Sequence, residues 1–97
     1  GSPPMNLLKN APGSKPGQIL GIRPEHIDLV ESGGWAFTID TVELLGAERL
    51  LYGKVGGEEV TVRVEEGQPY PKPGETTQIL ARADRLHWFN AETGKRI

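Results

Sequence analysis

The segment from Phe37 to Val64, FTIDTVELLGAERLLYGKVGGEEVTVRV, constrains the fold more than any other part of the chain. Apolar side chains recur there at every second position, as at Phe37 and Ile39 and again at Val60, Val62 and Val64. This period of two places one face of an extended strand in a core. The segment therefore predicts strands that follow one another as a β meander.

The apolar positions change phase inside this segment. They are odd-numbered up to Ile39 and even-numbered from Val42 to Leu44. A regular strand cannot make this change without turning its apolar side to water, so the sequence predicts a bulge or bend at Asp40-Thr41. Such a bulge would curl a small sheet.

Two glycine sites divide the segment. Gly46 indicates a chain reversal or a bulge, and Gly56-Gly57 indicates the loop of a hairpin. The length of that loop stays open, because a two-residue loop would pair Leu51 with Val62 and a four-residue loop would pair Leu51 with Val64.

Both loop lengths agree about which side chains share a face. Each places Leu51 and Val55 on the same face as the alternating valines. Leu50 and Tyr52 then point the other way, and they need cover from a partner or from the rest of the chain.

Length and composition favour one small all-β domain. Ninety-seven residues with 36% hydrophobic content are enough for one domain and too few for two ordinary ones. Thirteen glycines and eight prolines disfavour a helical bundle and suit short strands joined by tight turns. We expect a small barrel of six or seven short strands with little helix, because closing a sheet removes its exposed edges.

Charge and cysteine content exclude several classes of function. The net charge is −2, with 11 basic and 13 acidic residues mixed along the chain, so a nucleic-acid partner is not expected. No apolar run approaches the roughly 20 residues that cross a bilayer, and no secretion signal is apparent. The chain has no cysteine for a disulfide or a thiolate metal site. This composition fits a cytoplasmic protein.

The order of segments predicts an N-terminal arm followed by the domain. Residues 1–18 are rich in proline and glycine and indicate a flexible linker or arm, in which residues 5–8 can form a short edge strand. Residues 19–97 form the predicted barrel domain. Residues 65–75 indicate a long surface loop, because they hold three prolines and two glycines.

No residue pattern predicts a catalytic, cofactor or metal site in this chain. The phosphate-binding pattern G-x-x-x-x-G-K-[ST] is absent, so this chain alone should not hydrolyse ATP. His26 and His87 lie far apart and have no cysteine partner, which favours structural or surface roles. Glu43 and Glu48 can face each other across a turn, but solvated turn carboxylates are the simpler interpretation.

The aromatic side chains allow two interpretations. Trp35, Tyr52, Tyr70, Trp88 and Phe89 can form a stacking platform for single-stranded nucleic acid. Basic residues are not interleaved with them, so core filling or a protein interface is favoured.

Four segments resemble one protein family. They are GSPPMNLL at 1–8, GIRPEHI at 21–27, VELLGAERLLYG at 42–53 and DRLHWFNAETGKRI at 84–97. These segments are similar to the C-terminal regulatory region of MalK/UgpC-type ATP-binding subunits of carbohydrate ABC importers. That region is a TOBE domain, also described as OB-like or MOP-like. Within that family, the chain resembles subunits that serve sn-glycerol-3-phosphate import.

The resemblance implies a non-catalytic β-barrel for regulation and dimerisation. Such a domain lies behind a nucleotide-binding domain, which would hold ATP and Mg²⁺, and packs against its twin in a second copy of the subunit. The implied partners also include the permease subunits and, in some members, an inhibitory regulatory protein. The implied location is the cytoplasmic face of the cell membrane.

The resemblance also assigns structural roles to residues of this chain. Gly46 and Glu48 would lie at the turn of the central meander. The signature strand and its corner would comprise Gly21, Ile22, Arg23, Pro24, Glu25, His26 and Ile27. We expect Leu50, Tyr52, Trp88 and Phe89 to contact the partner.

The chain departs from the family at one place. Between MNLL and GIRPEHI the family has a longer segment with additional strands, whereas here only KNAPGSKPGQIL intervenes. A barrel that lacks this piece would have open edges, which favours strand pairing between two chains. The alternative function is a free-standing OB-like domain that binds a small oxyanion, a sugar or an oligonucleotide.

Overall fold

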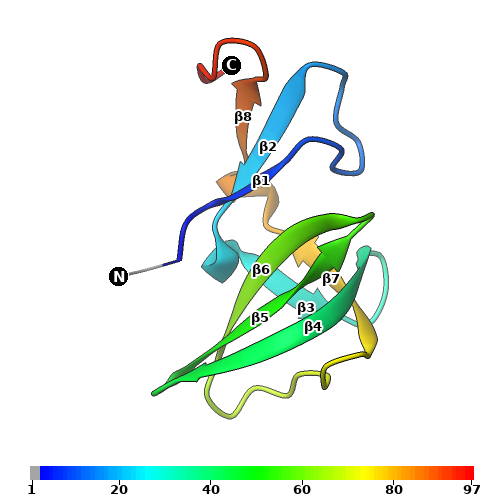
Figure 1. The fold of residues 1–97 in the computed structure, drawn as a ribbon, viewed down its shortest axis with the longest axis vertical. Helices are drawn as coiled ribbons and strands as arrows, with labels where there is room; N and C mark the ends of the chain where they lie inside the picture. The colour runs from blue at the N-terminus through cyan, green and yellow to red at the C-terminus, as the bar shows by residue number, and fades with distance from the viewer. Residues whose placement is uncertain (1–2) are drawn as a thin grey trace.

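Eight strands form two antiparallel sheets in the computed structural model, which describes residues 3–97 (Figure 1). One sheet has the order β1-β2-β8 and the other the order β3-β7-β4-β5-β6. In chain order the strands are β1 (Asn6–Leu8), β2 (Gln18–Ile22), β3 (Ile27–Val30), β4 (Trp35–Leu45), β5 (Glu48–Val55), β6 (Glu58–Glu65), β7 (Thr76–Ala81) and β8 (His87–Asn90). Two 3-10 turns, η1 (Pro24–His26) and η2 (Ala83–Arg85), complete the described secondary structure. The all-β prediction is confirmed.

The central meander is confirmed as β4, β5 and β6. The register between β4 and β5 shifts between Ile39 and Thr41, which is the predicted bulge. Leu51 pairs with Val62, so the hairpin loop is the two-residue Gly56-Gly57. Both glycines have positive φ, as a type I′ turn requires.

The core fills the space between the inner faces of the two sheets. From the meander it receives alternating residues such as Phe37, Leu51 and Val62, each completely buried. Leu20 and Ile22 of β2 complete it from the other sheet. The period-two pattern therefore produces the apolar face that it predicts.

The predicted closed barrel is corrected by the structure, which is OB-like but open, and has eight strands rather than six or seven. β3 and β6 are the two edges of the five-stranded sheet, and they come close without forming a ladder. The turn η1 packs against β6 at this place. Pro24 has no N–H to donate, so β3 cannot be extended backwards along β6 at that residue.

The two sheets are joined by a pair of corners, η1 and η2, which lie between them (Figure 1). The N–H of Arg82 donates a hydrogen bond of 3.0 Å to the carbonyl oxygen of His26, which links one corner to the other. The Arg82 guanidinium also forms two bonds to Asp28, with Nε–Oδ2 at 3.1 Å and Nη2–Oδ1 at 2.9 Å. These bonds continue the pairing of β3 with β7 into the two corners.

The N-terminal segment takes part in the fold. The edge strand expected within residues 5–8 is present as β1, which pairs with β2. Leu8 and Ala11 are buried in the core with exposed fractions of 1% and 5%. The division of the chain into an arm and a domain stays a prediction.

Candidate protein interface

Two of the four predicted contact residues lie side by side on β5. Leu50 and Tyr52 point away from the core face, as the sequence predicts. Leu50 is nevertheless only 3% exposed, so the rest of the chain covers it. Tyr52 is half-buried, and its hydroxyl donates a 2.8 Å hydrogen bond to Glu43. This bond raises the pKa of the Tyr52 phenol above its usual value.

The other two predicted contact residues lie on opposite faces of β8. Trp88 pairs with Leu20 and packs against the core, whereas Phe89 pairs with Ile19 on the outer side. The structure therefore does not bring the four residues together in one patch. Their role as contacts stays a prediction, and Phe89 has the surroundings that fit it best.

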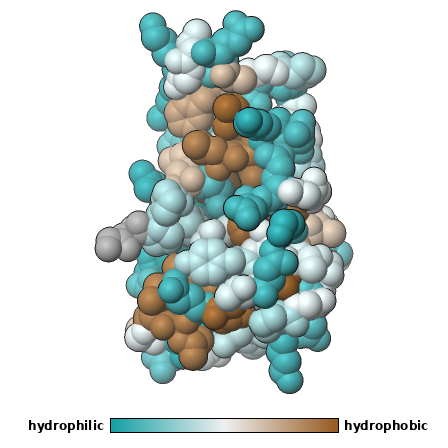
Figure 2. Space-filling model, viewed as in Figure 1, coloured by the Kyte–Doolittle hydropathy of each residue, from teal (hydrophilic) through white to brown (hydrophobic). Residues whose placement is uncertain are grey.

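Phe89 belongs to an apolar surface on the outer side of the three-stranded sheet. Its neighbours there are Met5, Leu7 and Ile19, and we call these four residues the apolar sheet face. Leu7 is 59% exposed, and Leu7, Ile19 and Phe89 line a shallow hollow of about 220 Å³. Figure 2 shows hydrophobic surface at the level of this sheet. An antiparallel sheet that faces water on one side usually carries polar residues on that side. The apolar residues on this face therefore indicate a surface that another protein can cover.

Gly21 forms the floor of the apolar sheet face. A Cβ atom at Gly21 would lie 2.5 Å from the sulfur of Met5 and 2.7 Å from Cε2 of Phe89. Both side chains therefore rest directly on the glycine backbone. This contact gives a packing reason for glycine at the start of the signature segment.

The rest of the signature segment forms the corner between the two sheets. Ile22 and Ile27 are buried in the core on either side of the buried Pro24. The N–H of His26 donates to the carbonyl of Arg23 at 3.0 Å, which closes the turn, and Glu25 is half-buried. The segment has a structural role, since it fixes where β2 ends and β3 begins.

The end of the β4–β5 hairpin is a second apolar surface. Leu44 and Leu45 are 64% and 45% exposed, and Figure 2 shows hydrophobic surface over this hairpin. Gly46 adopts a φ of 58° in the turn, which favours glycine. Glu48 forms an ion pair of 2.8 Å with Arg63 across the strands, so it does not face Glu43 as a catalytic partner.

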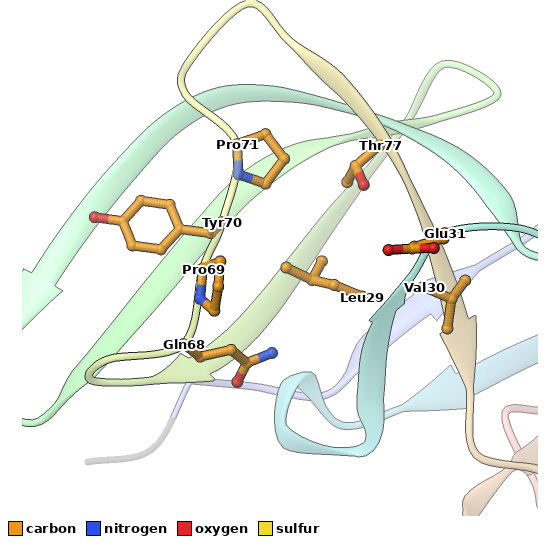
Figure 3. Close-up of a pocket in the computed structure, with 8 residues that line it drawn as sticks. All are labelled: Leu29, Val30, Glu31, Gln68, Pro69, Tyr70, Pro71 and Thr77. Atoms are coloured by element: carbon orange, nitrogen blue, oxygen red, sulfur yellow. The ribbon is translucent and has the colours of Figure 1, made fainter.

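A groove lies between the proline-rich loop and β3. Its volume is about 450 Å³. Figure 3 shows the loop on one side and Leu29, Val30 and Glu31 on the other, with the ring of Tyr70 directed away from these three. The full lining is Leu29, Val30, Glu31, Gln68, Pro69, Tyr70, Pro71 and Thr77. The one charged group in this lining is a carboxylate, which does not suit an oxyanion or a phosphodiester.

The stacking platform, the less favoured interpretation of the aromatic residues, is not assembled. Trp35 and Trp88 both pack against the core from different sheets, while Tyr70 lies in the proline-rich loop. Tyr52 and Phe89 belong to different sheets as well. Stacking of successive bases would require these rings to share one surface.

Metal-holding clusters and membrane-spanning helices are both absent from residues 3–97. Residues 3–97 contain no group of three or more His, Asp or Glu side chains able to hold a metal ion. The sequence also has no phosphate-binding loop. Within the same residues no helix is long and apolar enough to span a membrane.

The sequence interpretation missed most of the apolar sheet face. Met5 and Leu7 fall in the expected arm and Ile19 opens the expected barrel domain, and none of the three is assigned to a face. A signal was present, because Leu7-Leu8 and the run ILGI at 19–22 place apolar residues at consecutive positions. Such runs are typical of strands that are covered on both faces.

Comparison with known proteins yields a family match and a group of relatives. The family model described as TOBE domain matches residues 20–89. The sn-glycerol-3-phosphate import ATP-binding protein UgpC of Chromobacterium violaceum is 40% identical over 79 residues, which cover 79% of this chain and 21% of that protein. The proteins of the same name from Escherichia coli K12 and Salmonella typhi are each 41% identical over 80 residues, which cover 80% of this chain and 22% of the relative.

These coverages set the scope of the likeness. The chain spans about a fifth of the length of the relatives it matches. The matched family region begins in β2 and ends in β8, so it includes both corners and the whole five-stranded sheet.

Proposed function

This chain belongs to the TOBE domain family, and on that premise we propose that it is a non-catalytic regulatory and dimerisation domain of an importer's ATP-binding subunit. The imported solute would be a carbohydrate or glycerol 3-phosphate, because relatives at 40–41% identity carry the latter in their names. ATP and Mg²⁺ would bind to a nucleotide-binding domain of that subunit. This chain would add contacts and no reacting group.

The observation that carries the proposal is the apolar sheet face. Met5, Leu7, Ile19 and Phe89 form an apolar surface on the side of the three-stranded sheet that faces away from the core. Removing apolar area from water is favourable by roughly 25 cal/mol per Å². Association of a second copy through this face would therefore be favourable, and it would need no change in the fold.

The assembly would place the chain at the cytoplasmic face of the cell membrane. The ATP-binding subunits would form a homodimer and contact the permease subunits of the transporter. A regulatory protein can then act by binding one TOBE domain or both, and so change how far the two subunits separate.

Self-association of the chain tests the dimerisation part of the proposal. We expect sedimentation at high protein concentration to reveal a dimer, because two apolar sheet faces cover each other. Leu7→Ser should weaken dimerisation at least tenfold. The matched control is Leu80→Ser, since Leu80 is 44% exposed on the other sheet and should leave the association unchanged.

Two results would count against this use of the face. One is a chain that stays monomeric at every accessible concentration, and the other is equal weakening by both substitutions. Either would leave the family membership standing, because that rests on the match over residues 20–89.

A further inference from the structure

Asn6 makes an unusual pair of contacts for a residue in a short strand. Its side-chain Oδ1 accepts a hydrogen bond from the N–H of Thr61 at 2.8 Å, and its Nδ2 donates to the carbonyl of Thr61, also at 2.8 Å. Asn6 is 7% exposed. The carboxamide therefore reproduces the two main-chain bonds that a neighbouring strand would make with Thr61.

These contacts lie on the free edge of the five-stranded sheet. β6 is the last strand of that sheet, and it pairs with β5 along its other side. The N–H and C=O of Thr61 point to the free edge, since both bond to Asn6. In an antiparallel ladder these groups alternate direction, so those of Glu59 and Arg63 point the same way. β6 thus presents a row of edge groups that could template another strand.

Two neighbouring contacts hold the same edge. The carboxylate of Glu58 accepts the N–H groups of Lys9 and Asn10 at 2.8 and 2.7 Å. At the far end of β6, the N–H of Gln68 donates to the carbonyl of Glu65 at 3.1 Å. Asn6 lies between these points. The turn η1 and strand β1 also pack against β6, but Asn6 supplies the hydrogen bonds to the main chain of Thr61, so loss of its carboxamide would leave these groups unpaired.

We propose that the free edge of β6 is a latent pairing surface for a second copy of this chain, and that Asn6 keeps it closed. The partner is a second copy because the edge is complementary to itself. Antiparallel pairing of two β6 strands centred on Thr61 places Glu59 of each copy opposite Arg63 of the other. Opposite charges in facing positions favour this register.

This inference is independent of the apolar sheet face proposed for dimerisation. It uses the edge of the five-stranded sheet, whereas the proposed dimer uses the outer side of the three-stranded one. It also assigns a role to Asn6 within the motif GSPPMNLL, which the dimerisation proposal leaves unexplained.

Site-specific crosslinking tests the proposal, because the chain contains no cysteine. Thr61→Cys keeps the main-chain groups and introduces one thiol at the centre of the predicted pair. We expect a short thiol-reactive crosslinker to give little 61–61 product in the Thr61→Cys chain. Adding Asn6→Ala should raise that yield at least tenfold. The control thiol, Lys54→Cys, lies one strand inside the edge. Two such thiols would be three strand spacings apart and also staggered along the strands, so they would be separated by more than about 14 Å.

Two further variants test the mechanism and the register. Asn6→Asp keeps an acceptor for the N–H of Thr61 and loses the donor, so the crosslink yield should be intermediate. Arg63→Glu, added to the Asn6→Ala and Thr61→Cys chain, places glutamate opposite Glu59 and should return the yield to the parent level.

A folded Asn6→Ala chain with the parent yield at position 61 would overturn the proposal, with folding checked by circular dichroism. If Asn6→Ala does not fold, the Asn6→Asp comparison decides in the same way. Dimerisation through the apolar sheet face would not raise the 61–61 yield, so failure of either proposal can be told from failure of the other.

Discussion

Gly53 is predicted to be the glycine that this fold tolerates replacing least. It lies on β5 opposite Ile39, next to the bulge in β4. A Cβ atom at Gly53 would be 2.2 Å from the carbonyl oxygen of Thr38 and 2.8 and 2.9 Å from two ring atoms of Phe37. The nearest of these atoms belongs to the main chain of the paired strand, so it cannot rotate away.

The cost of Gly53→Ala can be worked out from these distances. Real Cβ atoms essentially never approach another heavy atom closer than 3.0 Å, so β4 and β5 would have to separate locally by about 0.8 Å. Overpacking of this kind costs about 1–3 kcal/mol, and alanine regains about 0.4–1 kcal/mol by restricting the unfolded chain. Because the clash involves main chain, we expect the upper end, a net loss of about 2 kcal/mol. For a domain of this size that loss lowers Tm by about 8–16 °C.

Thermal and urea unfolding of the two chains measure this loss. The matched control is Gly46→Ala, where a Cβ atom would meet nothing within 4 Å but the φ is 58°. Gly46→Ala should cost about 1 kcal/mol, from backbone strain alone. A Gly53→Ala chain that is as stable as the Gly46→Ala chain would refute the argument, since the clash would then have no energetic consequence.

Two other substitutions test the core and the corner. Leu51→Ala should lower the free energy of unfolding by about 2–5 kcal/mol, because Leu51 is completely buried. The control Leu44→Ala should change it by less than about 0.5 kcal/mol, since Leu44 is 64% exposed. Urea unfolding measures both values. The hydrogen bonds from Arg82 lower the pKa of Asp28 below its usual 3.8, so the stabilisation from this pair is fully present above that pH and is lost as the pH falls through the folded pKa. Asp28→Asn should therefore lower the free energy of unfolding by up to about 1 kcal/mol at neutral pH, and by less at pH values below the folded pKa. Urea unfolding at the two pH values measures this difference, and an equal loss at both would contradict the explanation.

Much of the five-stranded sheet could be predicted from the sequence, because its signals are local. Alternation locates β4 and β6, the phase change at Asp40-Thr41 locates the bulge, and Gly56-Gly57 locates the hairpin. Each of these signals depends on residues that are close in the chain. Local patterns fix which side of a strand is apolar, and they fix turns between neighbouring strands.

The pairings that decide the architecture could not be predicted in this way. β7 lies between β3 and β4, and β2 lies between β1 and β8, so both arrangements join segments that are far apart in the sequence. Alternation says which face of a strand is buried and does not name its neighbour. Open edges were expected only from the shortened segment before GIRPEHI, because alternation does not show whether β3 meets β6.

The candidate site shows the same limit at the level of single residues. Phe89 was identified from its aromatic side chain, but its neighbours Leu7 and Ile19 come from two other strands. Asn6 was missed altogether, because an asparagine in an edge strand predicts nothing about the partner of its carboxamide. That partner, the main chain of Thr61, lies 55 residues away in the sequence.

The two proposals meet in β1, whose side chains alternate between them. Asn6 and Leu8 point inward, where one caps β6 and the other fills the core, while Leu7 points outward to the apolar sheet face. A strand of three residues gains little stability from its own ladder, so it needs such anchors to stay in register. A slip of one residue would exchange the two sets of side chains, burying Leu7 and exposing Asn6. The bonds between Asn6 and Thr61 therefore do more than close an edge, since they also keep Leu7 on the outer side of the three-stranded sheet.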